Sequence, residues 1–192
     1  MTDSATEERT GKRERLTAGA AELIHRQGVE RTTLAEIAQA ADVPPGNVYY
    51  YFKTKDDLVR AVIEAREGNI EALLASFERR SSPAARLKAL AHNWADAAEL
   101  VAELGCPIGT LYTDLSKRPQ GLDRDAAHLY ELLIDWAQEQ FKAMGRKDAR
   151  DLAITLLAGV QGASLLANAF KDPKLMTREV RRLERWVDSL AP

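Results

Sequence analysis

Apolar residues recur at intervals of three and four along almost the whole chain, which is the spacing of one face of an α-helix. No stretch alternates strictly between apolar and polar residues, so we predict no β-strands. Glycine, proline and serine interrupt the pattern at a few points, where we expect helices to end. These points are Gly28, Ser81-Ser82-Pro83, Gly105-Cys106-Pro107, Pro119-Gln120-Gly121, Gly145 and Asp172-Pro173. The pattern therefore predicts an all-α fold of about nine helices.

Two short helices joined by a tight turn are predicted between residues 33 and 52. Thr33 and Glu36 have the spacing of a capping box, in which each side chain binds a free amide at the start of a helix. Pro45 opens the second helix, because proline is tolerated in a first helical turn. Two helices this short cannot form a core alone. We interpret them as a helix-turn-helix braced by the helix that ends at Gly28.

The sequence TTLAEIAQAADVPPGNVYYYFKTKDDL, residues 32–58, resembles the DNA-binding signature of the TetR/AcrR family of bacterial transcriptional regulators. The resemblance implies a three-helix helix-turn-helix head, followed by a larger helical domain for ligand binding and dimerisation. The partners it implies are a double-stranded DNA operator, a second copy of the chain and a small-molecule effector. We place a disordered acidic tail at residues 1–8, the head at residues 9–56 and the larger domain at residues 57–192.

The resemblance also implies which residues of the head meet DNA. By family position, the phosphate contacts are Thr33, Asn47, Tyr50, Tyr51 and Lys55, and the residues that face bases are Pro45, Gly46 and Tyr49. The chemistry agrees, because a glycine lets the helix approach the groove closely and a tyrosine phenol reaches phosphate oxygens. Val48 and Phe52 are expected to pack inward. Since Pro45 offers no hydrogen-bonding group, recognition depends more on DNA shape, and the operator sequence is not predicted.

The last two predicted helices carry apolar stripes that suit a four-helix bundle between two copies of the chain. The residues we assign to dimerisation are Leu156, Gly159, Ala163, Phe170, Leu183 and Val187. The small residues Gly159 and Ala163 allow another helix to approach closely. Ordinary packing within one chain is the alternative interpretation of the same stripes.

Six residues of the larger domain are candidates for binding the effector. They are Trp94, Leu111, Tyr112, Trp136, Phe141 and Gln161, and they lie on helices that wrap around a ligand in the family. Aromatic walls with few polar groups suit an apolar or aromatic compound. Each residue also fits a plain core position. His92 and His128 are either ligand contacts or surface residues.

Composition and charge exclude several classes of protein for this chain. The net charge of −2 argues against a non-specific polycation. No apolar run approaches the roughly 20 residues that cross a bilayer, and the segment MTDSATEERTGKRERL has no apolar stretch. We therefore expect no signal peptide, no membrane association and a cytoplasmic location. One cysteine and three scattered histidines predict no disulfide framework, no metal site and no cofactor.

These features together predict a dimeric repressor that a small, largely apolar ligand releases from a palindromic operator. An enzyme is disfavoured, because neither Cys106 nor His128 lies in a catalytic motif and the chain has no G-x-S-x-G sequence or glycine-rich phosphate loop. A helical protein-binding adaptor is the other class considered. A protein-binding adaptor does not need a capped helix-turn-helix with a glycine, Gly46, in the first turn of its second helix.

Cys106 supports an alternative mode of regulation. It lies between a long helix predicted to end near Leu104 and a short helix predicted to begin near Pro107, whose positive end favours a thiolate. A Gly-Cys pair here is similar to a subset of the family that senses electrophiles or oxidants through such a cysteine. The other interpretation is a small buried hydrophobic residue, which the apolar neighbour Ile108 favours.

Overall fold

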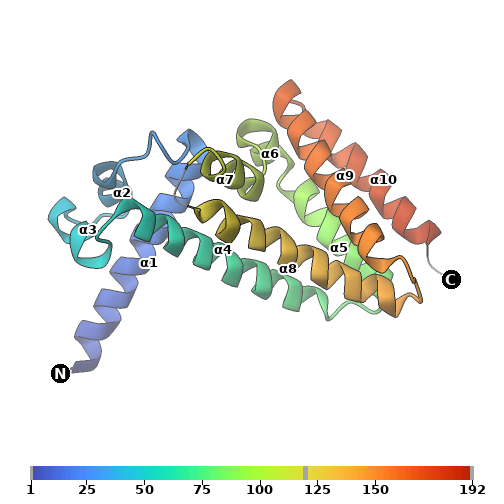
Figure 1. Ribbon diagram of the computed structural model, residues 1–192, viewed down its shortest axis with the longest axis horizontal. Coiled ribbons are helices and arrows are strands. Elements are labelled where there is room, and N and C mark those ends of the chain that lie inside the picture. Colours follow the sequence, from blue (N-terminus) through green and yellow to red (C-terminus); the bar gives the residue numbers. More distant parts are fainter. Residues whose placement is uncertain (1, 119–120, 191–192) are drawn as a thin grey trace. The chain divides into compact units, whose positions relative to one another are not determined.

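The computed structural model describes residues 2–118 and 121–190, with side chains described from residue 11 onward. These residues contain ten α-helices and no strand (Figure 1). The helices are α1 Thr2–Gln27, α2 Leu34–Ala40, α3 Pro45–Tyr51, α4 Lys55–Phe77, α5 Pro83–Asp96, α6 Ala98–Leu104, α7 Pro107–Leu115, α8 Leu122–Ala143, α9 Ala149–Phe170 and α10 Pro173–Ser189. The all-α prediction is confirmed.

The long helix predicted to end near Leu104 is in fact two helices, α5 and α6. They meet at Ala97, whose backbone angles of φ −97° and ψ 15° lie at the edge of the helical region. Neither proline nor glycine marks this break, so the pattern of the sequence carried no signal for it.

Helix α1 ends where the sequence predicted. Gly28 follows it with a φ of +84°, in the left-handed region, and donates its N–H to the carbonyl of Ile24 at 2.9 Å. Helix α1 begins at Thr2, so its range includes residues 2–8. This segment contains no proline, so nothing in its backbone interrupts the helical hydrogen bonds.

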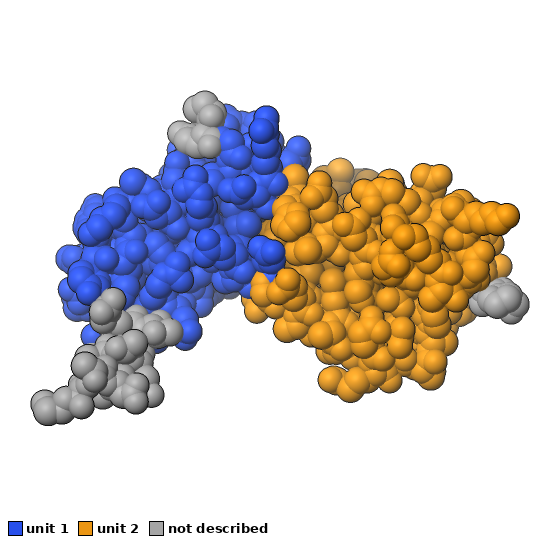
Figure 2. All heavy atoms as spheres, turned by 60° about the horizontal axis from the view of Figure 1, so that its bottom comes forward, with its two compact units in different colours: residues 1–67, 110–126 blue, residues 68–109, 127–192 orange. Residues whose placement is uncertain are grey.

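The chain forms two compact units (Figure 2). Unit 1 comprises residues 1–67 and 110–126, and unit 2 comprises residues 68–109 and 127–192. The predicted head, residues 9–56, is thus part of a larger unit that includes the start of α4 and a segment from the middle of the chain. Helices α4, α7 and α8 each contribute residues to both units.

Polar contacts explain why the segment 110–126 belongs to unit 1. The carboxylate of Asp114, on α7, accepts the N–H of Val29 at 3.0 Å. The guanidinium of Arg118, in the turn after α7, lies 2.9 Å from Glu30 and 2.9 Å from Asp56. These contacts join the turn after α1, the start of α4 and the end of α7, and we call the three residues Glu30, Asp56 and Arg118 the Arg118 clasp.

Helix α9 organises unit 2, where it packs against α5, α6 and α10. Its buried residues include Ala153, Leu156, Val160 and Ala167. It is also the one helix of the described residues that is long and apolar enough to cross a membrane by length and composition, with 39% of the apolar window buried. The buried face accounts for part of this hydropathy, and an exposed apolar face accounts for the rest.

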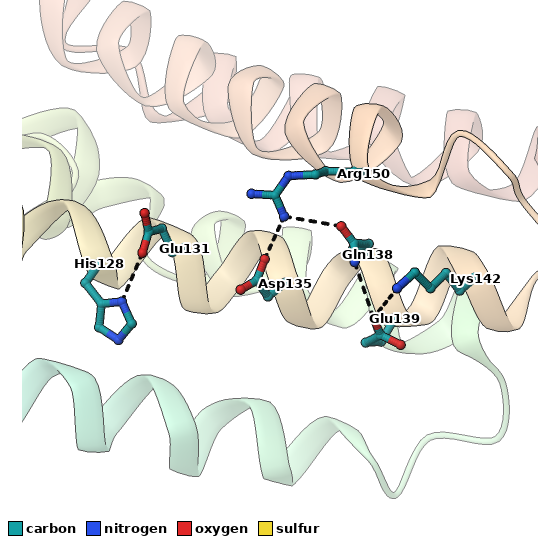
Figure 3. Close-up of polar contacts among 7 residues, drawn as sticks. All are labelled: His128, Glu131, Asp135, Gln138, Glu139, Lys142 and Arg150. Carbon is teal, nitrogen blue, oxygen red and sulfur yellow. Dashed lines mark hydrogen bonds and ion pairs between the residues drawn. The ribbon is translucent and has the colours of Figure 1, made fainter.

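The outward surface of α8 in unit 2 is polar (Figure 3). Arg150, at the start of α9, donates to Asp135 at 2.8 Å and to Gln138 at 3.2 Å. Lys142 donates to Glu139 at 2.8 Å. Gln138 also donates to Glu139, at 3.4 Å, and the two bonds that Glu139 accepts, led by the one from Lys142, lower its pKa. Solvent-exposed charged side chains thus cover this side of α8.

We expect the substitution Gly28→Ala to destabilise the protein. A left-handed backbone costs a residue with a side chain about 1–2 kcal/mol, and a Cβ at residue 28 would lie 2.8 Å from Oδ2 of Asp114. Gly68→Ala is the matched control, because Gly68 lies within α4 with no atom near its Cβ position, and alanine stabilises a helix by about 0.5–1 kcal/mol relative to glycine. Urea unfolding followed by circular dichroism at fixed chain concentration measures both changes. If the Gly28→Ala variant were as stable as the wild type, the claim that this turn requires glycine would be wrong.

Candidate nucleic-acid interface

The capping box predicted at the start of α2 is present. The Thr33 hydroxyl accepts the N–H of Glu36 at 3.2 Å, and the Glu36 carboxylate accepts the N–H of Thr33 at 2.8 Å. The Thr33 hydroxyl also donates to this carboxylate at 2.8 Å. These bonds, led by that of the Thr33 side chain, lower the pKa of Glu36. The Thr33 hydroxyl is therefore already engaged within the chain.

Helix α3 divides sharply between a buried and an exposed face. Val48 and Phe52 pack inward as predicted. On the other face, Tyr49 and Tyr50 are 58% and 59% exposed, and Pro45, Gly46 and Asn47 are exposed beside them. The exposure of two large aromatic side chains leaves a substantial apolar surface uncovered on a helix of seven residues.

Gly46 has no packing role within the described chain. A Cβ built at this position meets no atom within 4 Å, and its φ lies outside the left-handed region. Neither backbone strain nor a close neighbour in the chain therefore requires glycine here. Its lack of a side chain leaves the exposed end of α3 free to approach another molecule closely.

The lysines beside α3 are held by backbone carbonyls. Lys53 donates to the carbonyl of Tyr49 at 2.9 Å, and Lys55 donates to the carbonyl of Glu30 at 3.1 Å. A bond to a neutral carbonyl leaves the positive charge of each ammonium available to an anion. Sequence reasoning missed Lys53, although its place directly after the aromatic run was a usable signal.

The amide groups at the start of α4 are already bonded within the chain. Thr54 and Asp57 form a second reciprocal cap, in which the Asp57 carboxylate accepts the N–H of Thr54 at 2.9 Å and the Thr54 hydroxyl accepts the N–H of Asp57 at 3.0 Å. Asp56 adds another carboxylate to the same turn. These groups already occupy the positive end of the helix, so Lys55 would attract a phosphate mainly through its own charge.

None of the eight residues predicted to meet DNA is buried. All are in unit 1, and Tyr51 and Lys55 are half-buried while the other six are exposed. Tyr50 and Tyr51 contact each other edge to face, with ring centroids 5.1 Å apart. The arrangement is chemically suited to the surface of a nucleic acid, with phenol groups, two ammonium groups and one closely approachable helix end.

The six candidate effector residues are divided between the two units. Leu111 and Tyr112 belong to unit 1, and the other four belong to unit 2. Gln161 accepts a hydrogen bond from Tyr130 at 3.2 Å, whereas the indole of Trp136 donates to Glu78 at 2.9 Å.

Trp94 and Phe141 are buried core residues, as the plain alternative held, and the ring of Phe141 lies 6.0 Å from that of Trp186. Sequence reasoning missed Tyr130. His128 pairs with Glu131 and His92 with Glu184, both at half-exposed positions on the surface of unit 2.

The predicted dimer contacts require correction. Leu156, Ala163 and Val187 are buried inside unit 2, and a Cβ at Gly159 would lie 2.8 Å from Leu183 of the same chain. This stripe joins α9 to α10 within one subunit, so the alternative of intrachain packing holds for it. Phe170 alone among the six is strongly exposed, at 68%. The opposite side of α9 is uncovered.

Cys106 is buried, with 5% of its surface exposed. The side-chain amide of Gln161 donates to its sulfur at 3.5 Å. Gly109 lies close by, where a Cβ would be 3.2 Å from the Tyr130 hydroxyl and 3.3 Å from Oε1 of Gln161. Cys106, Tyr130 and Gln161 thus form a polar cluster in unit 2.

Comparison with known proteins agrees with this geometry. Residues 16–62 match the family described as "Bacterial regulatory proteins, tetR family". Residues 83–181, about half of the chain, match the "Transcriptional regulator LmrA/YxaF-like, C-terminal domain". The two matches fall on the helix-turn-helix region and on the helices that follow it.

Individual relatives support the same conclusion. An uncharacterized HTH-type transcriptional regulator of Lactococcus lactis is 26% identical over 83% of this chain and 85% of its own. The regulator AcrR of Shigella flexneri is 41% identical over 30% of this chain and 27% of its own. A solved TetR-family regulator from Agrobacterium tumefaciens superimposes with a TM-score of 0.81 at 25% identity, covering 92% of this chain and 97% of that one. The chain therefore belongs to the TetR family of bacterial transcriptional regulators, which bind DNA rather than catalyse a reaction.

Proposed function

We propose that this regulator is a homodimeric repressor that binds a palindromic operator through α2 and α3 and leaves it when a small, largely apolar effector binds. The observation that carries the proposal is the exposed face of α3, where two tyrosines and an unpacked glycine have no role in the core. A recognition helix in the major groove uses such a face. Two copies would bind half-sites about one DNA turn apart.

The proposed DNA contacts divide by chemistry. Asn47, Tyr50, Tyr51 and Lys55 bind phosphates, and we add Lys53 to this set because its ammonium is anchored near the same helix. Gly46 and Tyr49 face bases together with Pro45. The Thr33 hydroxyl would have to exchange its bond to Glu36 for a phosphate, so it is the weakest member of the set.

The substitution Gly46→Ala adds one methyl group to α3 and tests whether this helix docks closely in the DNA groove. We expect stability to stay equal or rise slightly, because alanine favours a helix and the site is open. Operator affinity should fall at least tenfold, since the new methyl group holds α3 away from the groove. Genomic fragments selected on the wild-type protein serve as the DNA, and fluorescence anisotropy measures the affinity.

Gly68→Ala, on α4, is the control and should bind as the wild type does. Wild-type affinity in Gly46→Ala would argue against close docking of α3. Failure of the wild-type protein to select any fragment would argue against the proposed function itself.

The proposed dimer interface is the exposed apolar face of α9. This outer face consists of Ile154, Ala158, Gly162, Leu165, Leu166, Ala169 and Phe170. It contrasts with the outward side of α8 in the same unit, which ion pairs cover (Figure 3). Leu165 and Phe170 are 69% and 68% exposed, and a contiguous apolar surface of this kind is typical of an interface. The small residues at its centre allow two α9 helices to cross closely.

The substitution Leu165→Glu should convert a dimer into a folded monomer, because it places a charge at the centre of the outer face while the core contacts of α9 stay intact. Ala143→Glu adds the same charge at the exposed end of α8 and should leave the dimer unchanged. Sedimentation velocity gives the mass, and circular dichroism checks the fold. A dimer of normal strength in Leu165→Glu would move the interface away from α9.

The proposed effector acts through the polar cluster of Cys106, Tyr130 and Gln161. These groups offer hydrogen bonds in an otherwise apolar part of unit 2, as small-molecule sites do. Helix α7 starts beside Cys106 in unit 2, and its later residue Asp114 accepts the N–H of Val29 in unit 1. An effector that displaced α7 would therefore disturb the turn before α2.

Oxidant or electrophile sensing by Cys106 is the second candidate. The hydrogen bond from the Gln161 amide to the sulfur favours it, because a chemical change at this sulfur would break a contact between the start of α7 and α9. Maleimide treatment of the DNA complex should release the wild-type protein but not Cys106→Ser, if the sulfur becomes accessible. Retention of DNA by a protein whose Cys106 is shown by mass spectrometry to be modified would end this candidate.

A further inference from the structure

Unit 1 contains a cavity of about 560 Å³, and its lining residues include none from α3. The turn after α1 lines one side with Gly28, Glu30 and Arg31. Helix α7 and the turn after it line the other with Asp114, Lys117 and Arg118. Small-molecule sites commonly have volumes of about 300–1,000 Å³.

The acidic groups of this cavity are already engaged. Glu30 pairs with the Nε of Arg118 at 2.9 Å, as part of the Arg118 clasp. Asp114 accepts the N–H of Val29 at 3.0 Å. Glu30 is therefore neutralised by Arg118, whereas Asp114, bound only by a neutral N–H, keeps its negative charge and offsets one of the remaining cations.

The basic groups of the cavity are not all engaged. Arg31 and Lys117 are exposed, and their side chains make no hydrogen bond or ion pair with the residues that the structure describes. Within the same described ranges, the buried Nη1 of Arg118 has no hydrogen-bond partner either. The cavity thus combines two free cations with a guanidinium whose hydrogen bonds are incomplete.

We propose that this cavity binds a small polyvalent anion, of the class of phosphorylated or multiply carboxylated molecules. A guanidinium fork and an ammonium are the side chains that proteins use for such groups. The anion lies between Arg31 and Lys117 and joins the turn after α1 to the turn after α7. Because Arg31 directly precedes Thr32 and the cap of α2, the ligand holds the turn that leads into the helix-turn-helix.

The same chemistry has a second source, since the anion could be a backbone phosphate of bound DNA. The cavity differs from the proposed DNA face in that cations and carboxylates are mixed in its walls, and a small free anion suits such a mixed lining better than a continuous phosphate backbone does. Salt dependence separates the two sources, because each phosphate contact adds about one unit to the slope of log affinity against log salt.

The experiment uses the full chain without DNA and titrates inorganic pyrophosphate at constant ionic strength, followed by calorimetry. We expect saturable binding of one pyrophosphate per chain in the wild type, and at least tenfold weaker binding in Arg31→Gln/Lys117→Gln. Arg26→Gln is the matched control, because Arg26 is an exposed cation of unit 1 outside the cavity, paired with Glu22. It should bind as the wild type does, and circular dichroism verifies that all variants fold.

Two results would overturn the site. One is the absence of saturable binding by the wild type, and the other is equal binding by the wild type and the double variant. A last measurement, the salt dependence of operator affinity without pyrophosphate, separates a free anion from a DNA phosphate. Equal salt slopes for the wild type and the double variant support a free anion, whereas a slope smaller by about two units in the variant overturns the free-molecule assignment in favour of a DNA phosphate.

Discussion

The Asp114 carboxylate lies 3.0 Å from the amide nitrogen of Val29, in the space that a side chain at residue 28 would take. Several features of unit 1 depend on this contact. It satisfies a backbone donor just beyond the end of α1, it requires glycine at the preceding residue, and it brings α7 to the turn that leads to α2. The Arg118 clasp repeats the connection a few residues later, so that the helix-turn-helix and the segment 110–126 are one folded body.

Helix α9 gives unit 2 its core and leaves an apolar surface on its other side. A helix that is apolar all round satisfies two sets of neighbours. Its inner residues pack against α5, α6 and α10, and its outer face has no cover within the described residues of the unit. In the proposed dimer, folding of the unit and association of two copies would use different faces of one helix, so substitutions would separate the two properties.

Local chemistry made unit 1 predictable. The Thr33 and Glu36 cap, the left-handed Gly28 and the buried Val48 and Phe52 all follow from short-range sequence patterns. Which face of α9 packs within the chain was not predictable, because both stripes of the helix are apolar and periodicity does not say which one a neighbour covers. The Arg118 clasp joins residues more than 60 positions apart, and the break at Ala97 lacks any helix-breaking residue. Neither feature leaves a local signal.

The carbonyl bonds of Lys53 and Lys55 have a consequence for the entropy of DNA binding. Each ammonium already donates to a carbonyl oxygen of its own chain. Because an ammonium has three N–H donors, a phosphate would bind either lysine without breaking that bond. Both side chains are already held in place, so such a contact would cost less rotamer freedom than one made by an unanchored lysine.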